Sequence, residues 1–216
     1  MTDREMQQHV QSALDWEPSV EATAIGVTVT DSVVTLRGDV GTYREKQTAE
    51  RVALGVYGVK GVANDLVVRP SNDYERTDSD IAQSAVTALQ LSFVVPRRKV
   101  TVSVTDGWLT LKGHVTWQFQ KDAAARAVRD LAGVLGVSNQ IALEPDVKAT
   151  DVRTKIEAAF KRSAEIDSRR VHVNVNDGEV VLTGNVRSWA ERQEAERAAW
   201  AAPGVTSVDD QLAVVP

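Results

Sequence analysis

The sequence contains no cysteine among its 216 residues, and only 5% of the residues are aromatic. Without thiols the chain has no disulfides, no thiolate metal ligands and no cysteine nucleophile. No apolar run approaches the roughly 18 residues that cross a bilayer, and the polar start at residues 1–5 does not resemble a secretion signal. These absences predict a soluble cytoplasmic protein.

Positive charge is also scarce, because 25 Lys and Arg residues against 30 Asp and Glu residues leave a net charge of −5. Proteins that bind nucleic acid neutralise phosphates with many basic side chains, so this balance argues against a nucleic-acid partner. The sequence also has no Gly-x-x-x-x-Gly-Lys-Ser/Thr loop, so it does not support a Walker-type nucleotide site.

One pattern is present three times: VTVTDSVVTLRGDV at 27–40, VSVTDGWLTLKGHV at 102–115 and VNVNDGEVVLTGNV at 173–186. The three segments align without a gap on Gly38, Gly113 and Gly184, which are 75 and 71 residues apart. The difference in spacing lies in the linkers, where exposed connections tolerate variation. These periods exceed those of thin stacked repeats, so we predict three small domains at 1–70, 78–145 and 149–216.

Each unit begins with apolar residues at helical spacing, as in Met6, Val10 and Leu14. A Ser/Thr-x-x-Glu pattern predicts capping boxes at the start of several helices: Thr2 with Glu5, Thr42 with Glu45, and Ser188 with Glu191. A second helix with small apolar residues follows the hairpin, and glycines are predicted to end it as left-handed caps: Gly58, Gly133 and Gly204.

The hairpins can be registered from their turns, because Asp106-Gly107 and Asp177-Gly178 favour a two-residue primed turn. The corresponding Asp31-Ser32 fits that turn less well. This register places valine and leucine on one face of each hairpin and mostly polar residues on the other. The predicted order is helix, strand, strand, helix, strand, with helices covering one side of the sheet.

These residues carry a resemblance to a known family. The hairpin ending in Leu-x-Gly-x-Val, the charged helix after it, the Gly-Val-x-x-Val turn and the final Asn/Asp-x-Leu/Ile strand resemble the BON domain of bacterial osmotic-stress and nodulation-associated envelope proteins. The resemblance covers all three units. It implies an α+β fold in each, with two helices packed on a three-stranded mixed sheet, no known catalytic centre, and a role in phospholipid binding or osmotic protection.

Reactive residues do not recur at common positions, as they would if each unit held an active site. The residue after the aligned glycine is Asp39, His114 or Asn185, and the other histidines, His9 and His172, lie at unrelated offsets. Neither a shared general base nor a converging set of metal ligands follows from this pattern. The sequence therefore predicts a protein that is not an enzyme and has no metal or cofactor.

Basic residues cluster before the hairpin in two of the three units, as Arg97, Arg98 and Lys99 and as Arg169 and Arg170. Each basic residue near an anionic membrane contributes about 1 kcal/mol, so such loops can give reversible attachment. The alternative interpretation is an ordinary solvated loop.

Trp108 falls on the polar face of the second hairpin in the predicted register. An exposed tryptophan suits a lipid or protein interface, and the competing interpretation is packing between neighbouring units. We expect the basic loop at 97–99 and Trp108 to lie beside each other and to form one binding surface.

The combined prediction is a non-catalytic triple BON-domain protein, cytoplasmic and peripheral at the inner membrane, that binds anionic phospholipid in osmotic stress. Three weak sites on one chain would raise avidity. The alternative is a protein-interaction or ion-sensing scaffold, in which the repeats pack on each other, on a protein partner or on a second copy of the chain.

Overall fold

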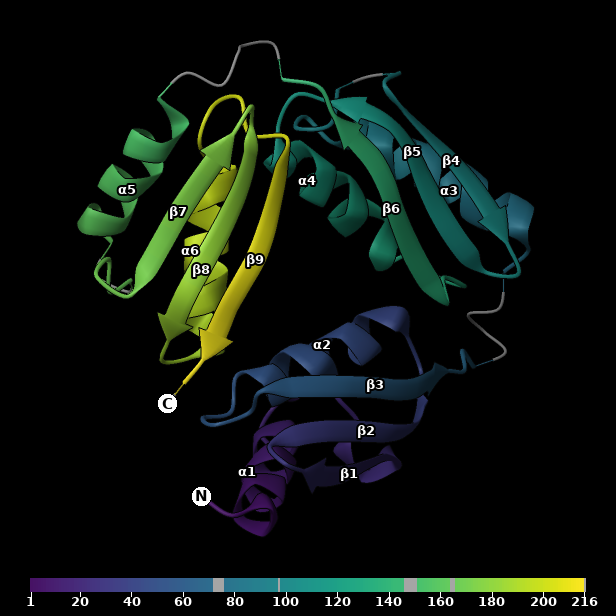
Figure 1. The fold of residues 1–216 in the computed structure, drawn as a ribbon. Coiled ribbons are helices and arrows are strands. Elements are labelled where there is room, and N and C mark those ends of the chain that lie inside the picture. The colour runs from purple at the N-terminus through teal and green to yellow at the C-terminus, as the bar shows by residue number, and fades with distance from the viewer. Residues whose placement is uncertain (72–75, 97, 146–150, 164–165, 216) are drawn as a thin grey trace. The chain divides into compact units, whose positions relative to one another are not determined.

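The computed structural model describes residues 1–71, 76–96, 98–145, 151–163 and 166–215. It contains three repeats of the predicted order helix, strand, strand, helix, strand (Figure 1). Repeat one consists of α1 (Asp3–Asp15), the short 3-10 helix η1 (Ala22–Ala24), β1 (Ile25–Thr30), β2 (Val33–Val40), α2 (Tyr43–Leu54) and β3 (Gly61–Val68).

Repeat two consists of α3 (Asp78–Leu91), β4 (Val100–Thr105), β5 (Trp108–Val115), α4 (Gln118–Arg129) and β6 (Gly136–Leu143). Repeat three consists of α5 (Val152–Arg162), β7 (Val171–Asn176), β8 (Glu179–Val186), α6 (Trp189–Trp200) and β9 (Ser207–Val214).

Each repeat has its own three-stranded sheet, and the second strand of the repeat lies in the middle. The hairpin strands pair antiparallel, whereas β3 pairs parallel to β2 and β9 parallel to β8. The predicted register is confirmed, since Val27 pairs with Leu36 in β1 and β2 and Val102 pairs with Leu111 in β4 and β5. The mixed sheet implied by the family resemblance is therefore present.

The hairpin turns have the left-handed backbone angles of primed turns. The first turn residue has φ of 51° at Asp31, 50° at Asp106 and 46° at Asp177, and Ser32 adopts φ of 66° although serine is less suited to it. The Asp3 carboxylate at the start of α1 accepts hydrogen bonds from the turn amides of Asp31 and Ser32 at 2.9 and 3.1 Å. This contact fastens the first helix to the tip of the hairpin.

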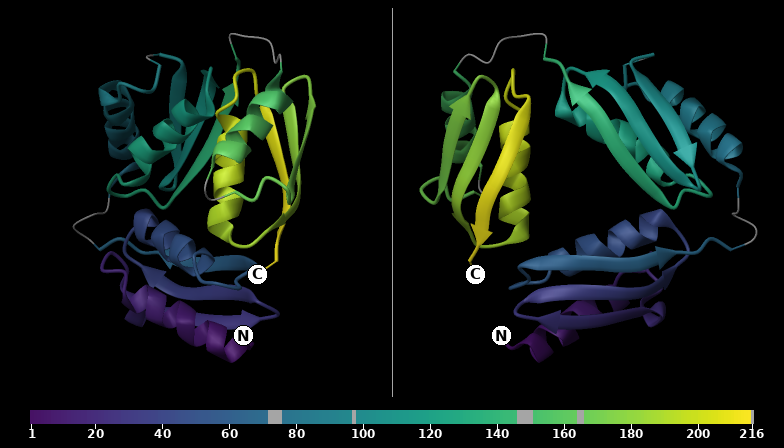
Figure 2. Two further views of the ribbon diagram at one scale, coloured as in Figure 1. Left: turned by 90° about the vertical axis from the view of Figure 1, so that its left-hand side faces the viewer. Right: turned by 45° about the vertical axis from the view of Figure 1, so that its right-hand side comes forward.

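The helices of each repeat cover one face of its sheet (Figure 2), and the apolar core lies between the two layers. The α1 stripe of Met6, Val10 and Leu14 is buried, as predicted. Val34 and Leu36 of β2 are fully buried beneath it. The opposite face of the sheet carries the polar side chains of the alternating pattern.

The recurring Asn/Asp-x-Leu/Ile strand fastens the last strand to the second helix. The Asn64 amide donates to the Lys46 carbonyl of α2 at 3.1 Å, and its oxygen accepts from the Leu66 amide at 3.4 Å. In repeat three Asp210 replaces the asparagine and pairs with Arg192 of α6 at 2.7 Å. The motif therefore has a structural role in these repeats.

Two details of the sequence prediction are wrong. Gly58, Gly133 and Gly204 do have positive φ angles of 87°, 84° and 88°. However, the second helices end earlier, at Leu54, Arg129 and Trp200. The glycines belong instead to the turn that follows, where the Val59 amide bonds to the Val56 carbonyl at 3.2 Å.

The second error concerns the capping boxes. The box of Thr2 and Glu5 forms completely, but Glu45 and Glu191 do not return to their N-cap amides. Their carboxylates accept instead from the residue before the cap, Gly41 at 2.9 Å and Arg187 at 2.7 Å. Only the hydroxyl half of each of these two boxes is present.

The aligned glycine of each repeat is required by a close backbone approach. A Cβ atom at Gly113 or Gly184 would lie 2.0 Å from the carbonyl oxygen of Lys99 or Arg170, and the φ angles are 133° and 118°. The residue before the first strand therefore lies in close backbone contact with the second strand at this point. This contact positions the last residue of each basic loop.

Candidate functional site

The basic residues predicted to bind anions lie in equivalent loops of repeats two and three. Arg98 and Lys99 are exposed just before β4, and Arg169 and Arg170 are exposed just before β7. The Lys99 carbonyl accepts from the His114 amide at 3.2 Å, and the Arg170 carbonyl accepts from the Asn185 amide at 3.1 Å. Arg97 lies outside the described residues.

Trp108, the first residue of β5, is 57% exposed. Its ring lies over Gly136, the first residue of β6, because a Cβ atom built on that glycine would be 2.4 Å from the ring. An aromatic ring beside a strand glycine shields the backbone that the glycine leaves bare. Trp108 thus combines a packing contact with a large exposed surface.

The structure does not bring Trp108 and the basic loop together. Val100 pairs with Gly113 at the open end of the hairpin, whereas Thr105 pairs with Trp108 at the turn. Five strand steps separate these ends, or about 17 Å at about 3.4 Å per residue. A hairpin necessarily places the residues before its first strand and those after its turn at opposite ends.

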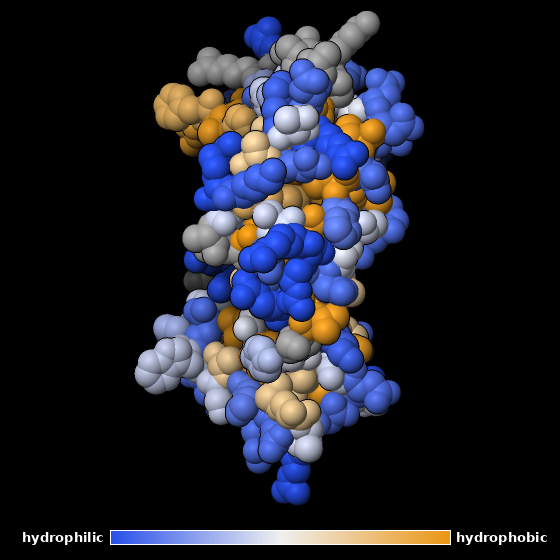
Figure 3. All heavy atoms as spheres, turned by 60° about the vertical axis from the view of Figure 1, so that its left-hand side comes forward, coloured by the Kyte–Doolittle hydropathy of each residue, from blue (hydrophilic) through white to orange (hydrophobic). Residues whose placement is uncertain are grey.

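Large apolar residues lie beside the basic loop instead. Leu91 is 73% exposed, Phe93 is fully exposed and Val94 is 43% exposed. Sequence reasoning missed them, although the alignment carries a signal, since Pro18 and Ser19 stand where Phe93 and Val94 are in repeat two. Exposed hydrophobic groups also show as separate patches among hydrophilic residues on the face drawn in Figure 3.

A groove with a volume of about 710 Å³ lies next to these residues, between α3 and β4. Val86 and Leu89 line it from the helix, and Val100 and Val102 line it from the strand. In the other repeats the equivalent strand residues are buried: Ile25 and Val27, and Val171 and Val173. The region between the first helix and the first strand is therefore open in repeat two and closed in repeats one and three.

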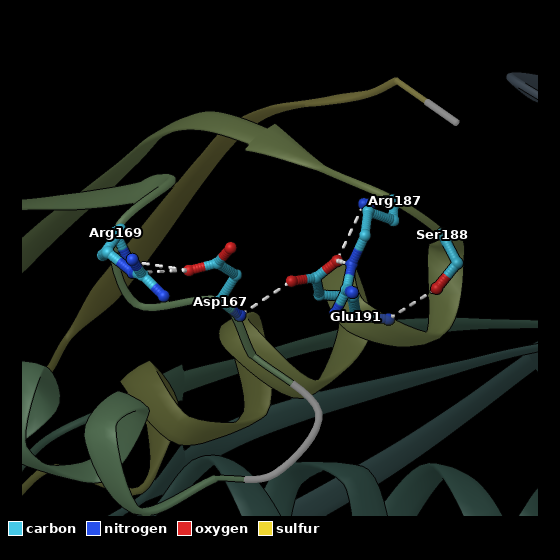
Figure 4. Close-up of polar contacts among 5 residues, drawn as sticks. All are labelled: Asp167, Arg169, Arg187, Ser188 and Glu191. Atoms are coloured by element: carbon cyan, nitrogen blue, oxygen red, sulfur yellow. Dashed lines mark hydrogen bonds and ion pairs between the residues drawn. The ribbon is translucent and has the colours of Figure 1, made fainter.

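A buried carboxylate holds the loop that precedes β7 in repeat three. Glu191 of α6 is 3% exposed, and its two oxygens accept hydrogen bonds from the Asp167 amide at 2.9 Å and the Arg187 amide at 2.7 Å (Figure 4). Its own amide donates to Ser188 at 3.2 Å. One side chain thus ties the loop before β7 to the start of α6. We call this contact the loop tether.

Repeat one has the same loop tether. Glu45 of α2 accepts from the Glu21 amide at 2.7 Å and from the Gly41 amide at 2.9 Å. In repeat two the glutamate is replaced by Gln120, and the loop residue that would donate is Pro96, which has no N–H. Repeat two cannot form this hydrogen bond.

The pKa of Glu191 reflects this environment. Burial alone would raise the pKa, because a buried carboxylate loses its hydration. Hydrogen bonds from the amides of Arg187 and Asp167, together with the Arg187 guanidinium, outweigh burial and lower the pKa below its usual value. The group is therefore an ionised structural acceptor at neutral pH.

Basic residues on the second helices are engaged within their repeats. The Lys46 ammonium donates to the Leu66 carbonyl at 2.7 Å. Arg192 pairs with Asp210 and lies 4.7 Å above the centre of the Trp189 ring. The exposed loops before β4 and β7 are consequently the better candidates for contacting an anionic partner.

In the described ranges, no three His, Asp or Glu side chains gather closely enough to hold a metal ion. Within the same residues, no helix has the length and apolar character of a transmembrane segment. The arrangement of repeat two offers an apolar groove, exposed hydrophobic groups and basic side chains. These are elements of a binding surface.

Part of the chain is similar in sequence to a curated bacterial protein. Osmotically-inducible protein Y of Escherichia coli (strain K12) is 32% identical over 145 residues, covering 65% of this chain and 72% of that protein. Two structures of CdsD, a structural protein of the type III secretion system of Chlamydia trachomatis, align with TM-scores of only 0.28 and 0.27. They are 15% and 14% identical, and cover 98% and 100% of this chain and 93% and 100% of their own.

One protein family matches all three repeats. The BON domain matches residues 2–70, 77–145 and 148–216, which is nearly the whole chain. The elements identified above coincide with these matches, each containing the same two helices and mixed sheet. The chain therefore belongs to the BON domain family and carries three tandem copies of the domain.

Proposed function

We propose that the chain is a non-catalytic protein that attaches to anionic phospholipid surfaces in the response to osmotic stress. The name of the related osmotically-inducible protein Y supports the stress role. The observation that carries the lipid role is the pairing of exposed Arg98 and Lys99 with exposed Leu91 and Phe93 in one loop region.

The charges suit a reversible contact. Four exposed basic residues, Arg98, Lys99, Arg169 and Arg170, occupy two equivalent loops on one chain. At about 1 kcal/mol each near an anionic membrane, they would contribute about 4 kcal/mol in total. Apolar side chains such as Phe93 add burial in the interfacial layer, at about 25 cal/mol per Å² of apolar area.

Co-sedimentation with vesicles of phosphatidylglycerol and phosphatidylcholine tests the proposal. The double variant Arg98→Glu/Lys99→Glu should bind at least about threefold more weakly, and binding should decrease with salt because the Debye length shortens. The matched control, Arg4→Glu/Lys60→Glu, changes the net charge equally at exposed positions of repeat one and should bind like the native chain.

Equal loss of binding in the two variants would show that only net charge matters and would reject the loop as the site. Absence of vesicle binding by the native chain at low salt would reject the phospholipid proposal itself.

A further inference from the structure

The groove of repeat two is bordered by β4, an edge strand of its sheet. Within the part of the chain that the structure describes, β4 pairs with no strand other than β5. In a two-residue hairpin the residues that close the turn bond to each other, and bonding then alternates along the strand. Thr105 closes the turn, so the N–H and C=O groups of Val100, Val102 and Val104 point away from β5.

Repeat one shows that this edge can be closed from within. Its equivalent edge carbonyl, that of Val27, accepts a hydrogen bond from the Gln7 side chain of α1 at 2.8 Å. In repeat two the residue at the position of Gln7 is Ala82, which has no donor. Among the described residues no side chain donates to the carbonyl of Val102. The edge capped in repeat one is therefore uncapped in repeat two.

The groove wall differs in the same repeat. Val86 of α3 lines the groove and is 44% exposed, whereas the equivalent residues in repeats one and three are Gln11 and Glu157. An apolar helix face, an open strand edge and a missing loop tether thus occur together in repeat two. Arg98 lines one end of the same groove and places a positive charge there.

The apolar side chains and the backbone groups that border the groove determine which kind of ligand fits it. An acyl chain would cover the valines but leave the amide and carbonyl groups of β4 without partners, which is costly when they are removed from water. An extended polypeptide satisfies both requirements, because its backbone continues the sheet while alternate side chains enter the groove.

We propose that repeat two binds an extended peptide segment of a partner protein by strand addition to β4. The segment has apolar residues at alternate positions, which face Val86, Leu89 and Val102, and an acidic residue at the end that meets Arg98. This activity goes beyond the phospholipid contact proposed above and does not depend on it.

The test uses the full chain and a fluorescein-labelled synthetic peptide of sequence Asp-Val-Thr-Val-Thr-Val-Thr, acetylated and amidated at its ends. Fluorescence anisotropy should show saturable binding without lipid. A matched peptide with its alternate amides methylated, so that the hydrogen bonds to β4 are lost, should bind at least about tenfold more weakly, a difference of about 1.4 kcal/mol.

Two variants convert repeat two to the closed state without changing its charge. Ala82→Gln installs the cap that Gln7 provides in repeat one, and Val86→Gln makes the groove wall polar. Each should weaken the peptide about tenfold. The control Ser84→Gln, at an exposed position of α3 outside the groove, should bind the peptide normally.

Hydrogen exchange provides a direct readout, because the peptide should slow exchange of the Val102 amide while leaving Val27 and Val173 unchanged. Equal affinity for the methylated peptide, or unchanged affinity in both Ala82→Gln and Val86→Gln, would overturn strand addition. Displacement of the peptide by phosphatidylcholine vesicles would assign the groove to lipid and also overturn it.

The outcome is separable from that of the phospholipid proposal. Both conversion variants keep Arg98, Lys99 and the net charge, so their vesicle binding should equal that of the native chain. Failure of vesicle binding with retained peptide binding would reject only the phospholipid proposal.

Discussion

Repeats two and three share one architecture but differ on one side of the domain. In repeat three the Glu191 carboxylate holds the loop before β7, and Val171 and Val173 of β7 are buried. In repeat two Pro96 lacks the amide for this contact, and Val100 and Val102 line an open groove. A single missing hydrogen bond in a loop thus accompanies a change from closed core to accessible surface.

The difference shows how a repeated domain can diversify. The hairpin, the backbone contact at the aligned glycine and the helix stripe persist in each repeat. The edge between the first helix and the first strand varies more, since Val100 and Val102 are only partly buried where Val171 and Val173 are buried. Divergence in binding is therefore expected at this edge.

The largest expected effect concerns the aligned glycine that repeats two and three share. Gly113→Ala and Gly184→Ala should each destabilise their repeat by about 3 kcal/mol or more, because the new Cβ would overlap a backbone carbonyl and the φ angle is left-handed. Chemical denaturation followed by circular dichroism measures the loss. Gly61→Ala is the control, since its Cβ would meet nothing within 4 Å. A small effect at only one of the two glycines would contradict the inference that repeats two and three share this backbone contact.

The next prediction concerns a variant that removes the loop tether from repeat three, as in repeat two. Glu191→Gln places a side chain with one acceptor oxygen where two backbone amides need acceptors, so it should cost about 1–3 kcal/mol. Hydrogen exchange of the Asp167 amide should accelerate. The converse Gln120→Glu alone should not stabilise repeat two, whereas Pro96→Glu with Gln120→Glu should. Slow exchange of Asp167 in the Glu191→Gln variant would argue against the loop tether.

The same carboxylate gives repeat three a pH dependence. Its pKa is lowered in the folded state below the usual value of 4.5, so its stabilising contribution is complete above that pH and is lost as the pH falls through the folded pKa. The stability difference between the native chain and Glu191→Gln should therefore be largest above about pH 4.5 and shrink below it. Denaturant midpoints across pH 3 to 7 measure this, and a constant difference would contradict it.

The smallest expected effect concerns the contact between Trp108 and Gly136 in repeat two. Gly136→Ala should cost about 1 kcal/mol, because the Trp108 ring must move to accommodate the methyl group. The cost should vanish in a Trp108→Ala background, which a double-mutant cycle on unfolding free energy would show. Repeat three, where Glu179 pairs with Ser207, has no such ring. An unchanged cost without the tryptophan would reject the contact.

Local patterns were enough to predict each repeat's framework. The alternation of valine around Asp106-Gly107 set the hairpin register, and the spacing of Met6, Val10 and Leu14 identified the buried helix face. Exposure of the basic residues Arg98 and Lys99 followed from their place in a loop. These features depend on periodicities of two and 3.6 residues, which the order of residues expresses directly.

The tertiary structure decided which surfaces are accessible. Glu191 finds the Asp167 amide 24 residues away, and no local pattern distinguishes that contact from a capping box. Likewise, Trp108 and Arg98 are close in sequence but lie at opposite ends of a hairpin, while Leu91 and Val86 both line the groove. The sequence by itself determined three copies of one fold, because its periodicities are local. Only tertiary packing decided that repeat two is open, because coverage of an edge depends on hydrogen bonds between distant segments.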